Sequence, residues 1–213
     1  MFENIKRLIN RWSKKNYYNT KYPYVDIEYN RTDKLGTLKI DVRQFLNKND
    51  FNYPLFNGLS EDKKAVECLT WVIDNVDYTP DTSQYKLNEY WSFGYETMKH
   101  KKGDCEDGAI LLYNIMRHNG IPAWKIRVSA GLVINPYTDK KEGHAYVTYY
   151  CETHDKWVIL DWCYLANLLE VKYRADYKEE IRYSYIWFSF NEEHSWSKGL
   201  NNKAKIFLER VYD

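Results

Sequence analysis

The stretch KKGDCEDGAILLY, residues 101–113, places one cysteine among acidic side chains directly before an apolar run. A cysteine acts as a nucleophile through its thiolate rather than its thiol. Carboxylates beside the sulfur oppose that ionisation, so Asp104, Glu106 and Asp107 raise the question of what stabilises a thiolate at Cys105. The stretch indicates either a buried structural cysteine or a nucleophile that is activated by residues elsewhere in the chain.

Two residues downstream have the side chains that such a nucleophile needs. His144 begins the strand-like run GHAYVTYY, and Asp161 ends the strand-like run KWVILD. A thiol, an imidazole base and a carboxylate that orients the base divide amide cleavage into acylation, through a thioester, and deacylation. Because one helix start and two strand ends can meet in space, we predict a triad of Cys105, His144 and Asp161.

Typical energies indicate which group could lower the pKa of the Cys105 thiol. A helix N-terminus stabilises a negative charge by about 0.3–1 kcal/mol, whereas one pKa unit corresponds to about 1.4 kcal/mol. The helix alone therefore lowers the pKa of the Cys105 thiol by less than about one unit. We expect the imidazolium of His144 to supply most of the stabilisation of the thiolate.

The acidic residues around Cys105 have two explanations. With Asp104 at the N-cap and Asp107 three residues later, the two carboxylates would form a capping-box-like pair on the free N–H groups of a helix start. Alternatively, Asp104 and Glu106 hold a cation, for which Ca²⁺ is the natural choice because it prefers oxygen ligands. The sequence favours capping and leaves the calcium site open.

The elements that would position these residues follow from periodicity. A helix is predicted from Ser60, with Val66, Leu69, Ile73 and Val76 on its apolar face. A second helix begins at Cys105, buries Ala109, Leu112, Ile115 and Met116, and ends at His118-Asn119-Gly120. Strand-like runs follow: AWKIRVSAGLVI, GHAYVTYYC, KWVILDWCY and RYSYIWFSF. Helices before strands predict an α+β fold, with an antiparallel sheet packed on the helix of Cys105.

The first 58 residues have a different pattern. Phe2, Ile5, Ile9 and Trp12 recur at helical spacing, while two alternating runs around RTDKLG predict a β-hairpin. We therefore expect an N-terminal arm over residues 1–58 and a catalytic domain over residues 59–213. The arm is a candidate for contact with a protein assembly partner; membrane binding is disfavoured because the helix is short.

Composition excludes several other classes. A net charge of +1 gives no overall field that would attract nucleic acid. Cys68, Cys151 and Cys163 lie in apolar runs without C-x-x-C spacing, which indicates buried thiols rather than a zinc site or disulfides. No run is long enough to span a bilayer and no signal peptide is recognisable, so we expect a cytoplasmic or particle-associated protein.

The motifs resemble those of a known family. GDCEDGAILLYNIMRHNGIPAWKIRV, GHAYVTYY and VILDW occur in the order found in the transglutaminase-like cysteine hydrolases, most similarly in the bacterial transglutaminase-like cysteine proteinases. The resemblance covers about residues 60–196. It implies a papain-like α+β core with Cys105 as nucleophile, His144 as base and Asp161 as its partner. It also implies that Asp104 and Glu106 occupy positions where some relatives bind calcium.

The mechanism also needs donors for the oxyanion. The backbone N–H of Cys105 is one, and the side chain of Trp91 or Tyr90 is a candidate for the other. The sequence thus predicts a cysteine hydrolase or acyltransferase that acts on amide bonds of proteins or peptides and requires no cofactor unless calcium binds. The alternative is a non-catalytic structural or binding component of a phage particle or another assembly that uses the same fold.

Overall fold

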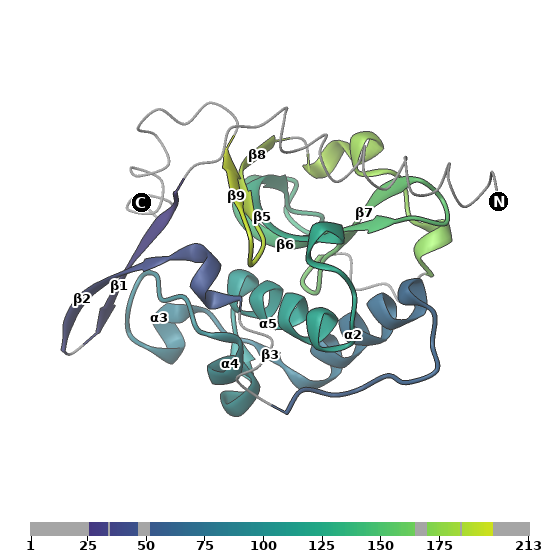
Figure 1. Ribbon diagram of the computed structural model, residues 1–213. Coiled ribbons are helices and arrows are strands. Elements are labelled where there is room, and N and C mark those ends of the chain that lie inside the picture. The colour runs from purple at the N-terminus through teal and green to yellow at the C-terminus, as the bar shows by residue number, and fades with distance from the viewer. Residues whose placement is uncertain (1–25, 34, 47–51, 165–169, 184, 198–213) are drawn as a thin grey trace.

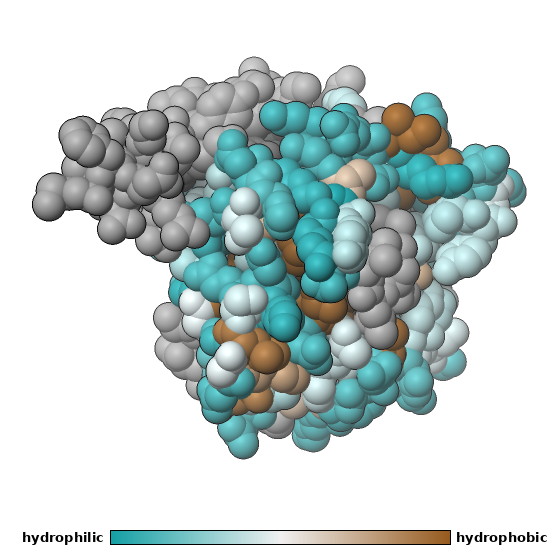
Figure 2. Space-filling view, turned by 90° about the vertical axis from the view of Figure 1, so that its right-hand side faces the viewer, coloured by the Kyte–Doolittle hydropathy of each residue, from teal (hydrophilic) through white to brown (hydrophobic). Residues whose placement is uncertain are grey.

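Figure 1 shows a computed structural model of the chain, in which the structure describes residues 26–33, 35–46, 52–164, 170–183 and 185–197. The predicted N-terminal helix, at residues 2–12, lies outside these ranges. None of the helices in the described ranges is both long and apolar enough to cross a membrane. On the face seen in Figure 2, apolar residues form separate patches within a mostly hydrophilic surface.

The main sheet is antiparallel, as predicted. It has the strand order β7-β6-β5-β8-β9. Its strands are β5 (Ile126–Ile134), β6 (Lys141–Cys151), β7 (Lys156–Leu160), β8 (Tyr185–Phe190) and β9 (Ser195–Ser197). Each of these strands, apart from the two at the edges, pairs on both sides, and β6 contributes a nearly continuous buried run. Such a run needs cover on both faces of the sheet.

Helix α5 (Cys105–His118) lies against this sheet and is the most buried helix described (Figure 1). The sequence predicted one apolar face, but every residue from Cys105 to Met116 is buried. A helix buried all round lies inside the domain rather than on its surface. The predicted end of the helix is confirmed, because Asn119 caps it and Gly120 has φ +83°.

Helix α2 (Glu61–Asn75) begins as predicted, with the Ser60 hydroxyl accepting a hydrogen bond from the Lys63 N–H. Its buried face is rotated from the predicted one. Ala65, Cys68, Leu69 and Val72 are buried, whereas Val66 and Ile73 are only partly covered. Helix α2 packs against α5.

Short elements connect α2 to α5. They are β3 (Asp77–Tyr78), α3 (Asp81–Gln84), α4 (Gly94–His100) and β4 (Lys102–Gly103). Strands β3 and β4 pair in parallel, so the chain leaving α2 is hydrogen-bonded to the chain that enters α5. This pairing fixes the approach to Cys105. The 3₁₀ helices are η1 (Val42–Phe45), η2 (Ala123–Lys125), η3 (Val171–Tyr173), η4 (Tyr177–Glu179) and η5 (Ile181–Tyr183).

The predicted N-terminal hairpin is present as β1 (Glu28–Asp33) and β2 (Gly36–Asp41), paired antiparallel. Its tip projects from the molecule in Figure 1. Its base does not, because Ile27, Tyr29 and Ile40 belong to the same hydrophobic core as α5. The boundary at residue 58 stays a prediction, and removal of residues 1–58 would take these side chains out of that core.

Strand β8 contains an irregularity beside β5. Ala130 pairs with Phe188 and Gly131 with Ile186, so Trp187 is an extra residue on β8. A β-carbon on Gly131 would lie 2.0 Å from the carbonyl oxygen of Tyr185, which leaves room only for hydrogen. Bulges of this kind redirect a side chain, and Trp187 lines the cavity described next.

Candidate active site

A cavity of about 640 Å³ lies at the N-terminal end of α5. Cys105 and His144 both line it, together with Asp104, Asn88 and Trp187 among others. Cys105 is the first residue of α5, and His144 is the fourth residue of β6. The fold therefore brings the predicted nucleophile and the predicted base to one cavity.

The strand that carries His144 also influences Cys105. Burial raises the pKa of the Cys105 thiol, and the backbone N–H of Ala145, the residue after His144, acts against that rise. The thiol itself donates to Glu106 Oε2 at 3.3 Å. Within the described ranges, no hydrogen bond joins Cys105 to His144. In this conformation the thiol proton is directed to Glu106 rather than to the imidazole.

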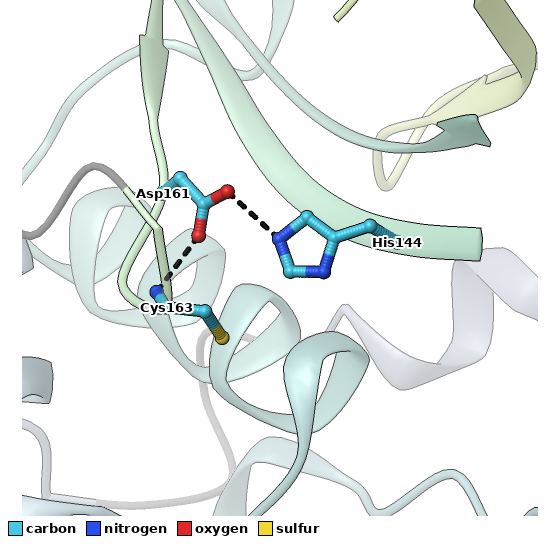
Figure 3. Close-up of side chains that lie close together, drawn as sticks. All are labelled: His144, Asp161 and Cys163. Atoms are coloured by element: carbon cyan, nitrogen blue, oxygen red, sulfur yellow. Dashed lines mark hydrogen bonds and ion pairs between the residues drawn. The ribbon is translucent and has the colours of Figure 1, made fainter. Parts of the chain in front are cut away.

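A buried pair joins His144, near the start of β6, to Asp161, directly after the end of β7 (Figure 3). Nε2 of His144 lies 2.7 Å from Oδ2 of Asp161, and neither residue is more than 4% exposed. Because Nε2 faces the carboxylate, Nδ1 is the ring nitrogen left for chemistry at the cavity. This is the orientation that a carboxylate imposes on a catalytic imidazole.

The carboxylate of Asp161 is held on both oxygens. Oδ1 accepts from the backbone N–H groups of Cys163, at 2.7 Å, and Tyr164, at 3.2 Å. Oδ2 accepts from the Tyr183 hydroxyl, at 2.7 Å, as well as from His144. Burial acts to raise the pKa of Asp161, but the charge of His144 and these hydrogen bonds outweigh it and hold that pKa below its ordinary value.

Cys163 is a residue that the sequence reasoning treated only as a buried apolar thiol. Its sulfur and the ligand atoms of His144 and Asp161 lie within 4.8 Å of one another (Figure 3). Cys163 does not line the cavity, however, whereas Cys105 does. The sequence shows that Cys163 follows Asp161 by two residues. It does not show that Cys163 lies near the His144 ring, because that depends on the turn after β7.

Tyr164 covers the imidazole. Its ring stacks on that of His144, with centroids 4.2 Å apart and planes at 21°. The Tyr164 hydroxyl donates to Glu142 Oε2 at 3.1 Å, and Asn135 donates to the same oxygen at 3.0 Å. This network fixes one face of the His144 ring and was not predicted from sequence.

The capping interpretation of the acidic residues is wrong. The Asp104 side chain makes no hydrogen bond to the start of α5. Asp107 instead accepts from the N–H of Ser92, at 2.7 Å, and from its hydroxyl, at 3.3 Å. The backbone of Asp104 is extended, with ψ −159°, which is compatible with an N-cap, but its Oδ1 atom is buried without a hydrogen-bond partner among the described residues.

Asp104 lies among other acids, which together form the acidic cluster: Asp81, Glu89, Asp104, Glu106 and Asp107. Ligand atoms of Asp81, Glu89 and Glu106 lie within 4.8 Å of one another, as do those of Asp81, Asp104 and Asp107. Burial raises the pKa values of Asp104 and Glu89, and the neighbouring Glu106 carboxyl group acts against that rise. Among the described residues, one oxygen each of Asp81, Asp104 and Glu106 is buried without a hydrogen-bond partner.

Such crowding disfavours ionisation. Burial, followed by the charge of Asp104, raises the pKa of Asp81 to about 7 and that of Glu89 to about 8. The same two causes raise the pKa values of Glu106 and Asp107 well above normal. Burial and the charge of Asp104 also raise the pKa of the Cys105 thiol, against the Ala145 N–H, which lowers it. The acidic cluster therefore opposes formation of the thiolate unless a cation compensates it.

The two residues predicted as oxyanion donors lie away from the cavity lining. The indole N–H of Trp91 donates to Glu89 Oε1 at 2.5 Å, and its ring stacks on Tyr29 with centroids 5.1 Å apart. The hydroxyl of Tyr90 accepts a hydrogen bond from Arg31. In this conformation both groups serve the contact between the hairpin and the core.

The sequence profile of the transglutaminase-like superfamily matches residues 54–162, about half of the chain and the part that contains Cys105, His144 and Asp161. The chain belongs to the transglutaminase-like superfamily. Its α+β architecture, with an antiparallel sheet packed on the helix that begins at Cys105, is the one predicted for this family.

Several solved structures are similar to this transglutaminase-like chain. One of LapG from Legionella pneumophila has a TM-score of 0.49 and 19% identity, covering 72% of this chain and 80% of LapG. The EGTA-treated and calcium-bound structures of the same protein each have a TM-score of 0.48 and 20% identity, covering 72% of this chain and 81% of LapG. At this identity the likeness is one of fold. No curated protein sequence matches the chain significantly.

Proposed function

We propose that the chain is a cysteine hydrolase that cleaves amide bonds of proteins or peptides through a thioester on Cys105. The observation that carries the proposal is the buried His144–Asp161 pair at 2.7 Å, in which His144 lines the same cavity as Cys105. A structural core would not need a histidine and a nucleophile that share a cavity. The superfamily match supports the same assignment.

In the proposed reaction, the Cys105 sulfur attacks the substrate carbonyl while His144 takes the thiol proton at Nδ1. His144 then gives that proton to the leaving amine, and Asp161 keeps Nε2 protonated throughout. Because the thiol of Cys105 donates to Glu106 in the present conformation, the proposal requires the sulfur to rotate towards the imidazole before attack. Water resolves the thioester in a hydrolase, and a second amine would resolve it in an acyltransferase.

The backbone N–H of Cys105, at the first turn of α5, is the first oxyanion donor in this proposal. The Asn88 side chain, which lines the cavity, is a candidate for the second. Trp91 would have to leave Glu89, and Tyr90 would have to leave Arg31, before either contacted a substrate oxygen.

The acidic cluster fits a bound calcium ion. Its donors are carboxylate oxygens, which Ca²⁺ prefers, and the buried oxygens of Asp81, Asp104 and Glu106 without a partner are the kind that a cation satisfies. Asp104 and Glu106, with Asp81, are the residues that would hold it. When bound, the ion supplies positive charge that offsets the effect of Asp104 on the Cys105 thiol.

Alkylation tests the proposal directly. Iodoacetamide should label Cys105 faster than the other thiols, and Cys105→Ala should lose cleavage of a casein or peptide substrate. Cys163→Ala is the matched control, because it removes the other thiol near His144 and should retain most activity. Loss of activity in Cys163→Ala with activity retained in Cys105→Ala would contradict the assignment. A folded chain with equal, slow labelling of every thiol would favour the structural or binding role.

A further inference from the structure

Tyr183 has a hydrogen bond that the sequence did not indicate. The sequence placed it in an aromatic strand, but it ends the 3₁₀ helix η5, is 2% exposed, and lies 22 residues after Asp161. Its hydroxyl donates to Asp161 Oδ2 at 2.7 Å. This is the oxygen that faces His144 Nε2, also at 2.7 Å. Tyr183 and the imidazole thus share one acceptor atom.

Packing holds the Tyr183 ring in place. It contacts Tyr146 edge-on, with centroids 4.8 Å apart, and Tyr146 is the second residue after His144 on β6. Burial raises the pKa of Tyr183, and the negative charge of Asp161 raises it further. The hydroxyl therefore keeps its proton and remains a donor. A permanent donor on Oδ2 withdraws negative charge from the atom that binds the base.

We propose that Tyr183 is a positioning residue for the reaction: its hydroxyl fixes the carboxylate of Asp161 and sets how strongly that carboxylate holds His144. The inference rests on the proposed function for its kinetic consequence, but not for its structural one. Without the Tyr183 hydroxyl, Oδ1 of Asp161 keeps its two backbone N–H donors. Oδ2 of Asp161 then keeps only His144 as a donor among the described residues.

Other groups also face the His144–Asp161 pair, so a pH effect has to be separated from theirs. The groups are the Cys105 and Cys163 thiols, the carboxylates of Asp104 and Glu142, the hydroxyls of Tyr146 and Tyr164, and the buried guanidinium of Arg174 near Tyr183. Tyr183→Phe leaves each of these side chains in place.

The kinetic experiment compares Tyr183→Phe with Tyr149→Phe. Tyr149 is a matched control because it is buried, lies on β6, and donates to a carboxylate, Asp62 Oδ1, at 2.8 Å but away from His144. For Tyr183→Phe we expect kcat to fall about tenfold or more with KM changed less than about twofold. The acid limb of the pH profile should move up by roughly half a unit, because greater charge on Oδ2 favours the protonated imidazole and the reaction needs His144 as the unprotonated base.

A second measurement does not depend on activity. In Cys105→Ala protein labelled with ¹⁵N-histidine, the Nε2–H proton of His144 should give a downfield resonance. Tyr183→Phe should move that resonance further downfield, because Asp161 becomes a stronger acceptor, and Tyr149→Phe should not. If the resonance moves but no cleavage is found with any protein substrate, the proposed function fails and the role of Tyr183 stands.

An unchanged resonance, together with unchanged kcat and pH profile in Tyr183→Phe, would overturn the inference. If Tyr183→Phe does not fold, the Cys105→Ala protein decides the question by itself. A slowly exchanging Tyr183 hydroxyl proton with a nuclear Overhauser effect to the His144 ring supports the shared oxygen, and a rapidly exchanging hydroxyl without that effect overturns it.

Discussion

Asp161 shows how much of the site depends on one side chain. Its two oxygens accept hydrogen bonds from two backbone N–H groups, a tyrosine and the imidazole, and its pKa lies below the ordinary value although it is completely buried. A carboxylate so fully bonded stays charged and stays oriented. It therefore fixes which nitrogen of His144 carries the proton.

Asp161→Asn should lower kcat by about 10²–10⁴-fold, because the amide can present its NH₂ group to Nε2 and favour the wrong tautomer of His144. Cleavage rates and the rate of Cys105 alkylation measure the effect. Asp176→Asn, at the partly exposed N-cap of η4, is the control and should change neither rate. Near-normal alkylation in the Asp161→Asn protein would mean that Cys105 does not depend on the pair.

The sequence indicated the residues of this site better than it indicated their partners. Cys105, His144 and Asp161 were identifiable from type and from their places at element ends, and the structure brings them to one region. The partners of Asp107 and Asp161, which are Ser92 and Tyr183, lie 15 and 22 residues away. Local rules favoured a capping box for Asp104 and Asp107, whereas tertiary packing supplied Ser92.

At the scale of elements, α5 and the turn after β7 are held together by a close contact. Trp162 donates its indole N–H to the carbonyl of Cys105 at 3.2 Å. Its ring lies over Gly108, where a β-carbon would come within 2.1 Å of the ring. Helix α5 therefore packs closely against the turn after β7 at Gly108, which has no side chain.

Gly108→Ala should destabilise the protein by about 1–3 kcal/mol, since overpacking against Trp162 exceeds the roughly 1 kcal/mol gained in helix propensity. Urea unfolding measures this change. In a Trp162→Leu background the same substitution should cost much less, because the smaller side chain leaves room for the methyl group. An equal cost in both backgrounds would show that the contact with the indole is not the cause.

Element types were predictable because helices and strands of this chain have strong periodic patterns. Helix α2 began at the predicted cap, and the antiparallel strands occurred where alternation or apolar runs predicted them. The start of β8 was not predictable, since Tyr183 continues the aromatic pattern of the strand but belongs to η5. The burial of α5 on all sides was missed because only the tertiary fold shows what covers its second face.

For the whole molecule, the acidic cluster predicts a dependence of stability on pH and on calcium. The folded state raises the pKa of Asp81 to about 7 and of Glu89 to about 8, so it binds more protons than the unfolded chain between about pH 4 and pH 8. Without a cation, stability is therefore highest at the acidic end of this window and falls as the pH rises through it.

Calcium should reverse this loss. In calorimetry with Ca²⁺ against EGTA, the Tm increase should be larger at pH 8 than at pH 6, by at least the roughly 2–4 °C that 1 kcal/mol produces in a chain of this size. The Asp104→Asn/Glu106→Gln variant should be more stable than the natural chain at pH 8 in EGTA and should not respond to Ca²⁺. Identical Tm values with and without Ca²⁺ at both pH values would remove the calcium proposal.

The β-bulge between Gly131 and Trp187 lies beside His144 and limits which residues around the cavity can be substituted. Gly131 pairs with His144 in the sheet and has room for no side chain, while its neighbours Leu132 and Trp187 reach the cavity wall. In laboratory evolution towards new substrates, the backbone beside the imidazole should stay fixed, whereas Leu132 and Trp187 can be substituted. Changes of preference can accumulate at these two residues while the strand that holds the imidazole keeps its place.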